Sequence, residues 1–179
     1  MPKLLHDQRE IFLKNAKKIL KEEGYSALSI RHLAKLSGAA SGTVYNYFRN
    51  KDVLVAAVML EDWEKSLEDM KREARSADDF PEGICAVCAC LSDYVQKNSP
   101  MWTQYMNNGG TSDVIAEHHG ALRDQINEVV CMLIKRTVND EEMLSMSALL
   151  SETVLTMAIH PELGENTLRC MAARLVRKC

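Results

Sequence analysis

Apolar residues recur at intervals of three and four along almost all of the 179-residue chain, which is the pattern of amphipathic helices. In the first such stretch Phe12, Ala16, Ile19 and Leu20 share one face. The alternation that marks strands is almost absent, so we expect an all-α fold of nine helices without a sheet. The predicted helices cover about residues 5–23, 29–37, 41–48, 50–76, 80–98, 99–107, 111–138, 139–159 and 165 to the end.

Turn and capping residues mark where these helices begin and end. Gly24 follows the first helix, where a C-terminal cap needs a left-handed residue. Ser29 and Asn50 are suited to cap the helices that follow them, because their side chains can accept hydrogen bonds from free backbone N–H groups. Pro100 is expected to start a new short helix, and His160-Pro161 is expected to break the helix that precedes it.

The composition is that of an ordinary globular chain, with 46% hydrophobic and 26% charged residues. The length fits one compact domain or two small ones. Apolar runs fall short of the roughly 20 residues that a membrane span needs, and the N-terminus lacks the apolar core of a secretory signal. Without an export signal, the six cysteines are expected to be reduced thiols. We therefore expect a cytoplasmic protein with no membrane partner.

The charge is divided unequally along the chain. The formal net charge of -3, taken alone, argues against a protein that binds nucleic acid. Residues 1–55, however, contain ten basic and five acidic side chains, a net charge of +5. Residues 56–179 contain twelve basic and twenty acidic side chains, a net charge of -8. Such a division is typical of a DNA-binding module attached to another domain. Four lysines form a stripe on the first helix that a solvated helix face would also explain: Lys14, Lys17, Lys18 and Lys21.

The basic segment has the pattern of a helix-turn-helix. Two short helices are joined by the small residues of Ser37-Gly38-Ala39-Ala40 and are preceded by a longer helix. In the second short helix Val44 and Phe48 share a face that should pack inward, and Gly42 permits a close approach to DNA. The opposite face would then be free to enter a major groove. Its hydroxyl and amide groups belong to Thr43, Tyr45, Asn46 and Tyr47.

Residues from about 8 to 56 closely resemble the N-terminal domain of TetR-family transcriptional regulators. The resemblance is specific, because glycines, aromatic residues and a Lys-Asp pair recur at the family's offsets. The residues that carry it are Gly24, Tyr25, Ala27, Ser29, Ile30, Arg31, Leu33, Ala34, Gly38, Gly42, Thr43, Val44, Tyr45, Tyr47, Phe48, Lys51, Asp52 and Leu54.

The resemblance implies a two-domain regulator, with a helix-turn-helix domain over residues 1–50 and a helical effector-binding and dimerisation domain over residues 51–179. Such a protein, expected to be a repressor, binds a palindromic operator in double-stranded DNA as a homodimer and is released by a small effector. By position, the expected DNA contacts are Ser29, Arg31, Ser41, Gly42, Thr43, Tyr45, Asn46, Tyr47 and Lys51.

One position departs from the family pattern. Ala40 stands where a Ser or Thr usually caps the recognition helix. Either Ser41 takes over the cap one residue later, or the helix lacks a side-chain cap worth about 1 kcal/mol. The departure changes which base contacts can be expected of this helix. The helix-turn-helix itself is still expected.

The acidic segment carries weaker signals. By resemblance, the apolar faces of its last two helices pair with those of a second copy, although intramolecular core is the alternative. The candidate interface residues are Leu149, Leu150, Val154, Met157, Leu168, Met171 and Leu175. An apolar or aromatic effector is expected among the middle helices, where ordinary core is again the alternative. The candidate pocket residues are Trp63, Cys88, Trp102, Tyr105 and Met106.

Cys85, Cys88 and Cys90 form a local cluster that admits three interpretations: buried small hydrophobic residues, a redox-active thiol pair or a metal site. The further metal-ligand candidates, His118 and His119, would point apart on a helix. We expect no cofactor and no metal site. A thiol- or metal-sensing regulator that uses Cys85 and Cys88 is the competing hypothesis. A helical enzyme is another, although the sequence offers no convergent nucleophile, acid and base.

Overall fold

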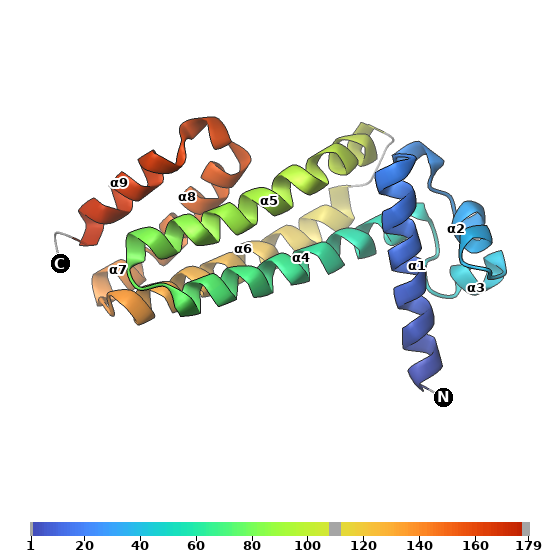
Figure 1. The fold of residues 1–179 in the computed structure, drawn as a ribbon, viewed down its shortest axis with the longest axis horizontal. Helices are drawn as coiled ribbons and strands as arrows, with labels where there is room; N and C mark the ends of the chain where they lie inside the picture. The colour runs from blue at the N-terminus through green and yellow to red at the C-terminus, as the bar shows by residue number, and fades with distance from the viewer. Residues whose placement is uncertain (1, 108–111, 177–179) are drawn as a thin grey trace. The chain divides into compact units, whose positions relative to one another are not determined.

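A computed structural model describes residues 2–107 and 112–176, except for the side chains of residues 2–6, 106 and 112–119. Over these ranges the chain forms nine α-helices, two short 3-10 helices (η) and no strand, so the expected all-α fold is confirmed. The elements are α1 (Pro2–Glu22), η1 (Tyr25–Ala27), α2 (Ile30–Leu36), α3 (Ser41–Tyr45), α4 (Lys51–Ser76), α5 (Phe80–Asn107), α6 (Ser112–Thr137), α7 (Glu141–Ser145), α8 (Ser147–Ile159), η2 (Pro161–Leu163) and α9 (Glu165–Val176) (Figure 1).

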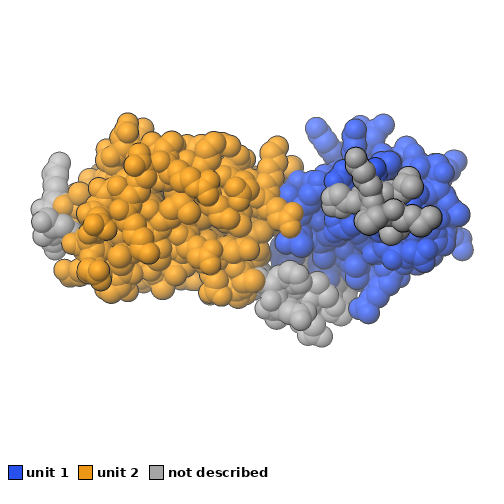
Figure 2. Space-filling model, turned by 90° about the horizontal axis from the view of Figure 1, so that it is seen from below, with its two compact units in different colours: residues 1–62, 98–111 blue, residues 63–97, 112–179 orange. Residues whose placement is uncertain are grey.

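The chain divides into two compact units (Figure 2). Unit 1 comprises residues 1–62 and 98–111, and unit 2 comprises residues 63–97 and 112–179. Two helices, α4 and α5, contribute to both units. In the described part of the chain, no helix is both long enough and apolar enough to cross a membrane.

The core of unit 1 is built from the apolar faces that the sequence pattern predicts. Phe12, Ala16 and Ile19 of α1 are completely buried, and α2 and α3 each add apolar residues to the same core. α2 packs against both α1 and α3. Buried side chains of the first turns of α4 complete the core: Leu54, Val55 and Val58.

Most of the predicted caps are present. Gly24 has a φ of 85°, a backbone conformation that glycine adopts without strain. The Ser29 hydroxyl accepts a hydrogen bond from the His32 N–H at 3.1 Å, and Asn50 Oδ1 accepts one from the Val53 N–H at 2.9 Å. The alternative in which Ser41 caps α3 is wrong. Ala40 is the N-cap residue of that helix, and its methyl group provides no cap.

Two predicted helix boundaries are wrong, and the errors offset each other in the helix count. The predicted break at Ser99-Pro100 is absent, and α5 continues through Pro100 to Asn107. Proline removes only its own N–H donor, and the Thr103 hydroxyl adds a bond to the Ser99 carbonyl at 3.0 Å in the next turn. The predicted helix 139–159 is instead interrupted at Met146, which lies between α7 and α8.

Unit 2 is a helical bundle with one continuous apolar core. Its core takes buried side chains from α4, α5, α6, α7, α8 and α9, and α7 and α8 both pack on α6. The contact between α5 and α6 is especially close at Gly83. A Cβ atom placed there would clash with Leu133 Cδ1 of α6 and lie 2.7 Å from Ala77 Cβ, so a larger residue at position 83 would require these neighbours to move.

The last two α-helices, α8 and α9, follow the apolar pattern but leave part of it uncovered. α8 carries Glu152 as its one ionisable side chain, and its apolar residues point in all directions. Val154 and Ala158 are completely buried, whereas Leu149 is 64% exposed and Ile159 is 49% exposed. An apolar helix with an exposed face is typical of a protein–protein contact.

The assignment of Ala40 as the N-cap residue of α3 can be tested by adding the missing side-chain hydrogen bond. Ala40 already has the extended backbone of an N-cap residue, with φ -72° and ψ 146°, so Ala40→Ser should supply the absent hydrogen bond. We expect it to stabilise the protein by about 1 kcal/mol, which for a chain of this size raises Tm by about 2–4 °C. Thermal unfolding followed by circular dichroism measures the change. Ala39→Ser is the matched control, and an equal Tm for the two variants would contradict the assignment.

Candidate nucleic-acid interface

The position of α3 is fixed by apolar and aromatic packing. Val44 is completely buried and Phe48, just after the helix, is 1% exposed. Between them in sequence, the Tyr47 ring packs edge-to-face on Phe12 with 5.4 Å between ring centroids. The Tyr47 hydroxyl donates a long hydrogen bond of 3.4 Å to Gln8 Oε1 of α1. Tyr47, an expected DNA contact, therefore also attaches α3 to α1.

The other face of α3 is open. Gly42, Tyr45 and Asn46 are exposed, and Ser41 and Thr43 are half-buried. Tyr45 has 53% of its surface exposed, so it does not pack into the core. A Cβ atom at Gly42 would meet nothing within 4 Å, which leaves open space beside the backbone there. These residues form one accessible surface of hydroxyl, amide and backbone groups.

The start of α2 adds a second part to this surface. Arg31 is exposed, and Ser29, also exposed, uses its hydroxyl to cap the helix. The turn before α3 is tied to α1 because the Asn15 amide donates to the Ser37 hydroxyl at 2.9 Å. Gly38 in that turn has a φ of 63°, which favours glycine. The sequence pattern did not reveal the Asn15–Ser37 bond, which joins residues 22 positions apart.

Lys51, the first residue of α4, makes two specific contacts within unit 1. Its ammonium donates to the Tyr25 carbonyl at 2.6 Å and lies 3.7 Å from the centroid of the Tyr25 ring. Burial lowers the pKa of Lys51, and the neighbouring Asp52 carboxylate partly opposes that change. Lys51 is one of the expected DNA contacts, whereas its contact with Tyr25 was not predicted from the sequence.

The charges around α2 and α3 favour an anionic partner. Residues 24–51 contain no acidic side chain, and they contain four basic ones: Arg31, Lys35, Arg49 and Lys51. The lysine stripe of α1 contributes less than its sequence suggests, because Lys17 pairs with Asp62 at 2.7 Å and Glu61 at 3.3 Å. The positive charge is therefore concentrated around α2, α3 and the start of α4.

The residues predicted to form one effector pocket are divided between the units. Trp63 and Cys88 belong to unit 2, and Trp102 and Tyr105 belong to unit 1. The Trp63 indole N–H donates to Gln125 Oε1 at 2.7 Å, and its ring packs edge-to-face on Tyr94 at 5.2 Å. Trp102 and Tyr105 are stacked, with centroids 6.0 Å apart. The side chain of Met106 lies outside the described residues.

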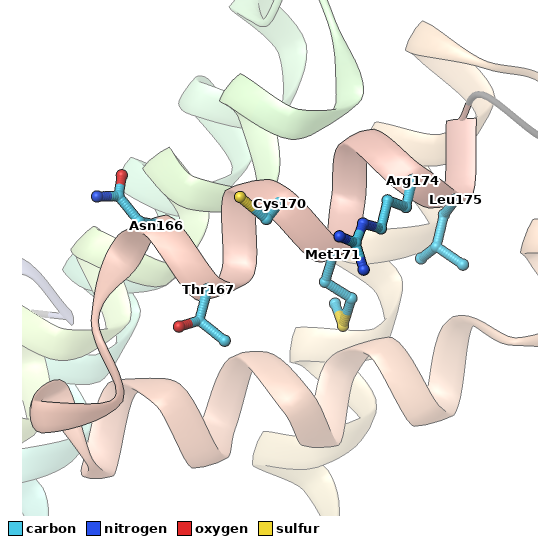
Figure 3. Close-up of a pocket in the computed structure, with 6 residues that line it drawn as sticks. All are labelled: Asn166, Thr167, Cys170, Met171, Arg174 and Leu175. Atoms are coloured by element: carbon cyan, nitrogen blue, oxygen red, sulfur yellow. The ribbon is translucent and has the colours of Figure 1, made fainter.

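The residues predicted for a dimer interface also separate into two groups. Leu150, Val154, Met157 and Leu168 are buried within a single chain, so they belong to the core of unit 2, the alternative that the sequence left open. Leu149 is exposed, and Met171 and Leu175 are half-buried. The last two line a surface hollow of about 610 Å³. Figure 3 shows that all the residues lining this hollow come from α9: Asn166, Thr167, Cys170, Met171, Arg174 and Leu175.

The cysteine cluster is mostly buried. Cys85 and Cys88 are buried in the core of unit 2, where the Cys88 thiol donates to the Val154 carbonyl at 3.7 Å, and Cys90 is half-buried. Burial raises the pKa of all three thiols, and that of Cys88 reaches about 11. Among the described residues, no three His, Cys, Asp or Glu side chains gather into a group that could hold a metal ion. The side chains of His118 and His119 lie outside the described residues.

Comparison with known proteins agrees with this geometry over the first third of the chain. Residues 12–58 match the family described as bacterial regulatory proteins, tetR family. Over 77 residues the chain is 32% identical to the HTH-type transcriptional repressor Rv1474c of Mycobacterium tuberculosis. The aligned region covers 41% of each protein. The chain thus spans about two fifths of the length of the curated relatives that it matches.

Solved structures resemble the chain over almost its full length. A transcriptional regulator of the TetR/AcrR family from Thermobifida fusca has a TM-score of 0.64 at 20% identity, over 95% of this chain and 96% of the other. The TetR family repressor AlkX from Dietzia sp., implicated in the biodegradation of n-alkanes, has a TM-score of 0.62 at 16% identity, with the same coverage. At these identities the likeness shows a shared two-domain helical fold.

The burial of the cysteines predicts a clear order of reactivity. At pH 8 a thiol with the pKa of Cys88, about 11, is roughly 0.1% thiolate, and the thiolate is the reactive form. We expect iodoacetamide to modify the exposed Cys170 rapidly and Cys88 only after denaturation, as measured by peptide mass spectrometry of the native and unfolded protein. Any labelling of Cys88 in the native protein should increase as the pH rises toward its pKa of about 11, because the thiolate fraction rises. Equal rates for Cys88 and Cys170 in the native protein would restore thiol sensing as a serious candidate.

Proposed function

Residues 12–58 are a domain of the tetR family of bacterial regulatory proteins, and from that premise we propose that the chain is a DNA-binding transcriptional regulator. It acts as a repressor that binds a palindromic operator as a homodimer, and a small effector releases it. The relatives with which it compares are regulators of transcription and not enzymes, so the enzyme hypothesis is set aside.

One observation carries the DNA-binding proposal. The open face of α3 offers Gly42, Tyr45 and Asn46 within a segment, residues 24–51, that has basic side chains and no acidic ones. Gly42 lets the backbone approach DNA, and the Asn46 amide has the donor and acceptor that an adenine edge requires. The exposed Tyr45 hydroxyl and Arg31 guanidinium suit phosphates. Val44 and Phe48 meanwhile anchor the helix from its buried side.

The proposed dimer uses the uncovered apolar surface of unit 2. Leu149 and Ile159 of α8 are exposed, and Met171 and Leu175 line the hollow on α9. A second copy of the chain is the occupant that also suits a palindromic site, because two DNA-binding units must reach half-sites about 34–36 Å apart. The contact is therefore smaller than the sequence suggested, since four of the seven candidate residues are already used in the core.

The proposed effector is apolar or aromatic and binds among α4, α5 and α6. In unit 2, Trp63 and Tyr94 provide aromatic surface, and the Trp63–Gln125 hydrogen bond provides a polar group of the kind that orients a ligand in an apolar site. The connection of the structurally similar AlkX with n-alkanes is compatible with such an effector. The buried, high-pKa thiols favour this proposal over thiol sensing.

DNA binding is tested on a sequence selected by the protein from random DNA. Arg31→Ala and Tyr45→Ala should each weaken binding to that sequence by about tenfold or more, as the loss of a charge-assisted or hydroxyl contact implies. Both side chains are exposed, so far-UV circular dichroism should be unchanged. Arg31→Ala should also lower the slope of log K against log salt by about 0.9.

Lys65→Ala, which removes an exposed charge from the unit 2 part of α4, is the matched control and should leave both the affinity and the salt slope unchanged. Failure of the wild-type protein to enrich any sequence, or binding that is insensitive to salt, would remove the basis for the regulator proposal.

Dimerisation is tested at the exposed leucine of α8. Leu149→Glu places a charge in the proposed interface of both copies, and burial of a leucine is worth about 1.5–3 kcal/mol. We expect the dissociation constant to rise by about 100-fold or more, so that light scattering coupled to gel filtration finds monomers at micromolar concentration. Leu60→Glu, at an exposed leucine of α4, is the control and should remain dimeric. A Leu149→Glu variant that stays dimeric would place the interface elsewhere.

A further inference from the structure

Lys17 links α1 to α4 through an ion pair that is largely shielded from water. Its ammonium donates to Asp62 Oδ1 at 2.7 Å and lies 3.3 Å from Glu61 Oε1. The Asp62 side chain is 10% exposed, whereas that of Glu61 is 48% exposed. A shielded carboxylate attracts a cation more strongly than one in open water, and it is costly to leave unpaired. Asp62 is therefore the principal partner of Lys17.

Lys51 and Asp62 both attach α4 to other elements of unit 1. Lys51 donates to the Tyr25 carbonyl of η1 at 2.6 Å, and Asp62 accepts from Lys17 of α1. Positions 51 and 62 are 11 residues apart, which is about three helical turns, so both side chains lie on one face of α4, about 16 Å apart along its axis. Val58 lies between them on that face and is buried. A helix attached at two separated points cannot pivot about either one, so the direction of α4 relative to α1 and η1 is fixed.

α1 in turn supports the helix-turn-helix at positions before and after α3 in the chain. The Asn15 amide donates to the Ser37 hydroxyl at 2.9 Å, in the turn that precedes α3. After α3, the Tyr47 ring packs on Phe12 with 5.4 Å between ring centroids, and the Tyr47 hydroxyl donates to Gln8 Oε1 at 3.4 Å. A change in the direction of α1 would therefore carry α3 with it.

We propose that Lys17 and Asp62 are positioning residues for DNA binding: their ion pair fixes the direction of α1 on α4, and α1 fixes the direction in which α3 presents its open face. The proposal rests on the DNA-binding function proposed above. It adds a role for a lysine that is not among the expected DNA contacts. Fixing the direction of α3 before DNA arrives transfers the cost of ordering from binding to folding, so the same contacts give tighter binding.

The sign of the effect at Asp62 separates positioning from simple attraction. Asp62→Asn removes a negative charge, which by charge alone favours binding to a polyanion. We expect it instead to weaken binding to the selected operator by about three- to tenfold, because the amide no longer holds the Lys17 ammonium. Fluorescence anisotropy titration of labelled operator measures the change. Tighter binding by Asp62→Asn would overturn the proposal.

A double-mutant cycle tests whether the two residues act as one unit. Lys17→Met should also weaken binding by about three- to tenfold, and adding it to Asp62→Asn should cause little further loss. Its slope of log K against log salt should equal that of the wild-type protein, because the proposed role of Lys17 involves no phosphate contact. Lys17→Arg keeps the charge and should retain most of the affinity. Additive losses, a slope lowered by about 0.9 in Lys17→Met, or an arginine variant as weak as Lys17→Met would overturn the proposal.

Two matched controls separate the ion pair from charge and truncation in general. Lys18→Met makes the same change at the next, exposed residue of α1 and should alter operator affinity by no more than about twofold. Glu64→Gln neutralises an exposed carboxylate of α4 two residues after Asp62 and should not weaken binding. Asp62→Asn is nearly isosteric, so it keeps the test usable if Lys17→Met does not fold. A control that loses as much affinity as its matched variant would overturn the specific role of the pair.

A second measurement does not depend on DNA. Ser37 and Tyr47 touch α1 through Asn15 and Phe12, so their backbone amide signals in NMR spectra of the free protein report the direction of α1. These signals should move in Asp62→Asn and in Lys17→Met, and they should stay in place in Lys18→Met. Signals that stay in place in both pair variants would overturn the positioning role, even if the protein binds its operator. A wild-type protein that binds no operator would instead remove the proposed function, whatever these signals show.

Discussion

The surface proposed for DNA binding depends on the burial of two apolar side chains. α3 has five residues and no side-chain cap, and an isolated helix of that length is unstable in water. Val44 and Phe48, both almost completely buried, hold it in place, and Tyr47 adds an edge-to-face contact with Phe12. Because the inward face is used in this way, Gly42, Tyr45 and Asn46 are displayed in a fixed arrangement. The proposed affinity for DNA and the stability of the core are therefore linked within α3.

The basic side chains of the chain are concentrated near the same proposed DNA surface. The net charge of -3 conceals a basic N-terminal segment and an acidic remainder, but the structure restricts the useful positive charge further. Lys17 of α1 is neutralised by Glu61 and Asp62, whereas the segment from residue 24 to 51 keeps four basic side chains with no acidic residue among them. The positive charge of the proposed DNA surface is thus provided by α2, α3 and the start of α4, the elements that also provide its polar groups.

Features that depend on neighbouring residues were predicted correctly from the sequence, whereas features that depend on contacts between residues far apart in the chain were not. Ser29 and Asn50 cap their helices as expected, because a cap requires only a few neighbouring residues. Pro100 failed to end a helix, since packing can outweigh the loss of one hydrogen bond. Leu150 and Val154 were expected at a dimer surface by resemblance, with intramolecular core as the alternative, and they lie in the core. Periodicity identifies an apolar face without showing what covers it. The contacts of Lys51 with Tyr25, 26 positions away, had no sequence signal at all.

Pro100 also determines where α5 is mechanically weak. It lies three residues into the part of α5 that belongs to unit 1, and it leaves the carbonyl four residues before it without the usual helical donor. A helix that lacks one bond of its ladder bends more easily there than elsewhere. The missing bond lies just before Trp102 and Tyr105 in the chain, whereas Gly83 lies near the other end of the helix, in close contact with Leu133 of α6. The one proline of α5 that lies inside the helix is thus placed next to the aromatic pair, and a force that bends α5 would be expected to act first at that turn.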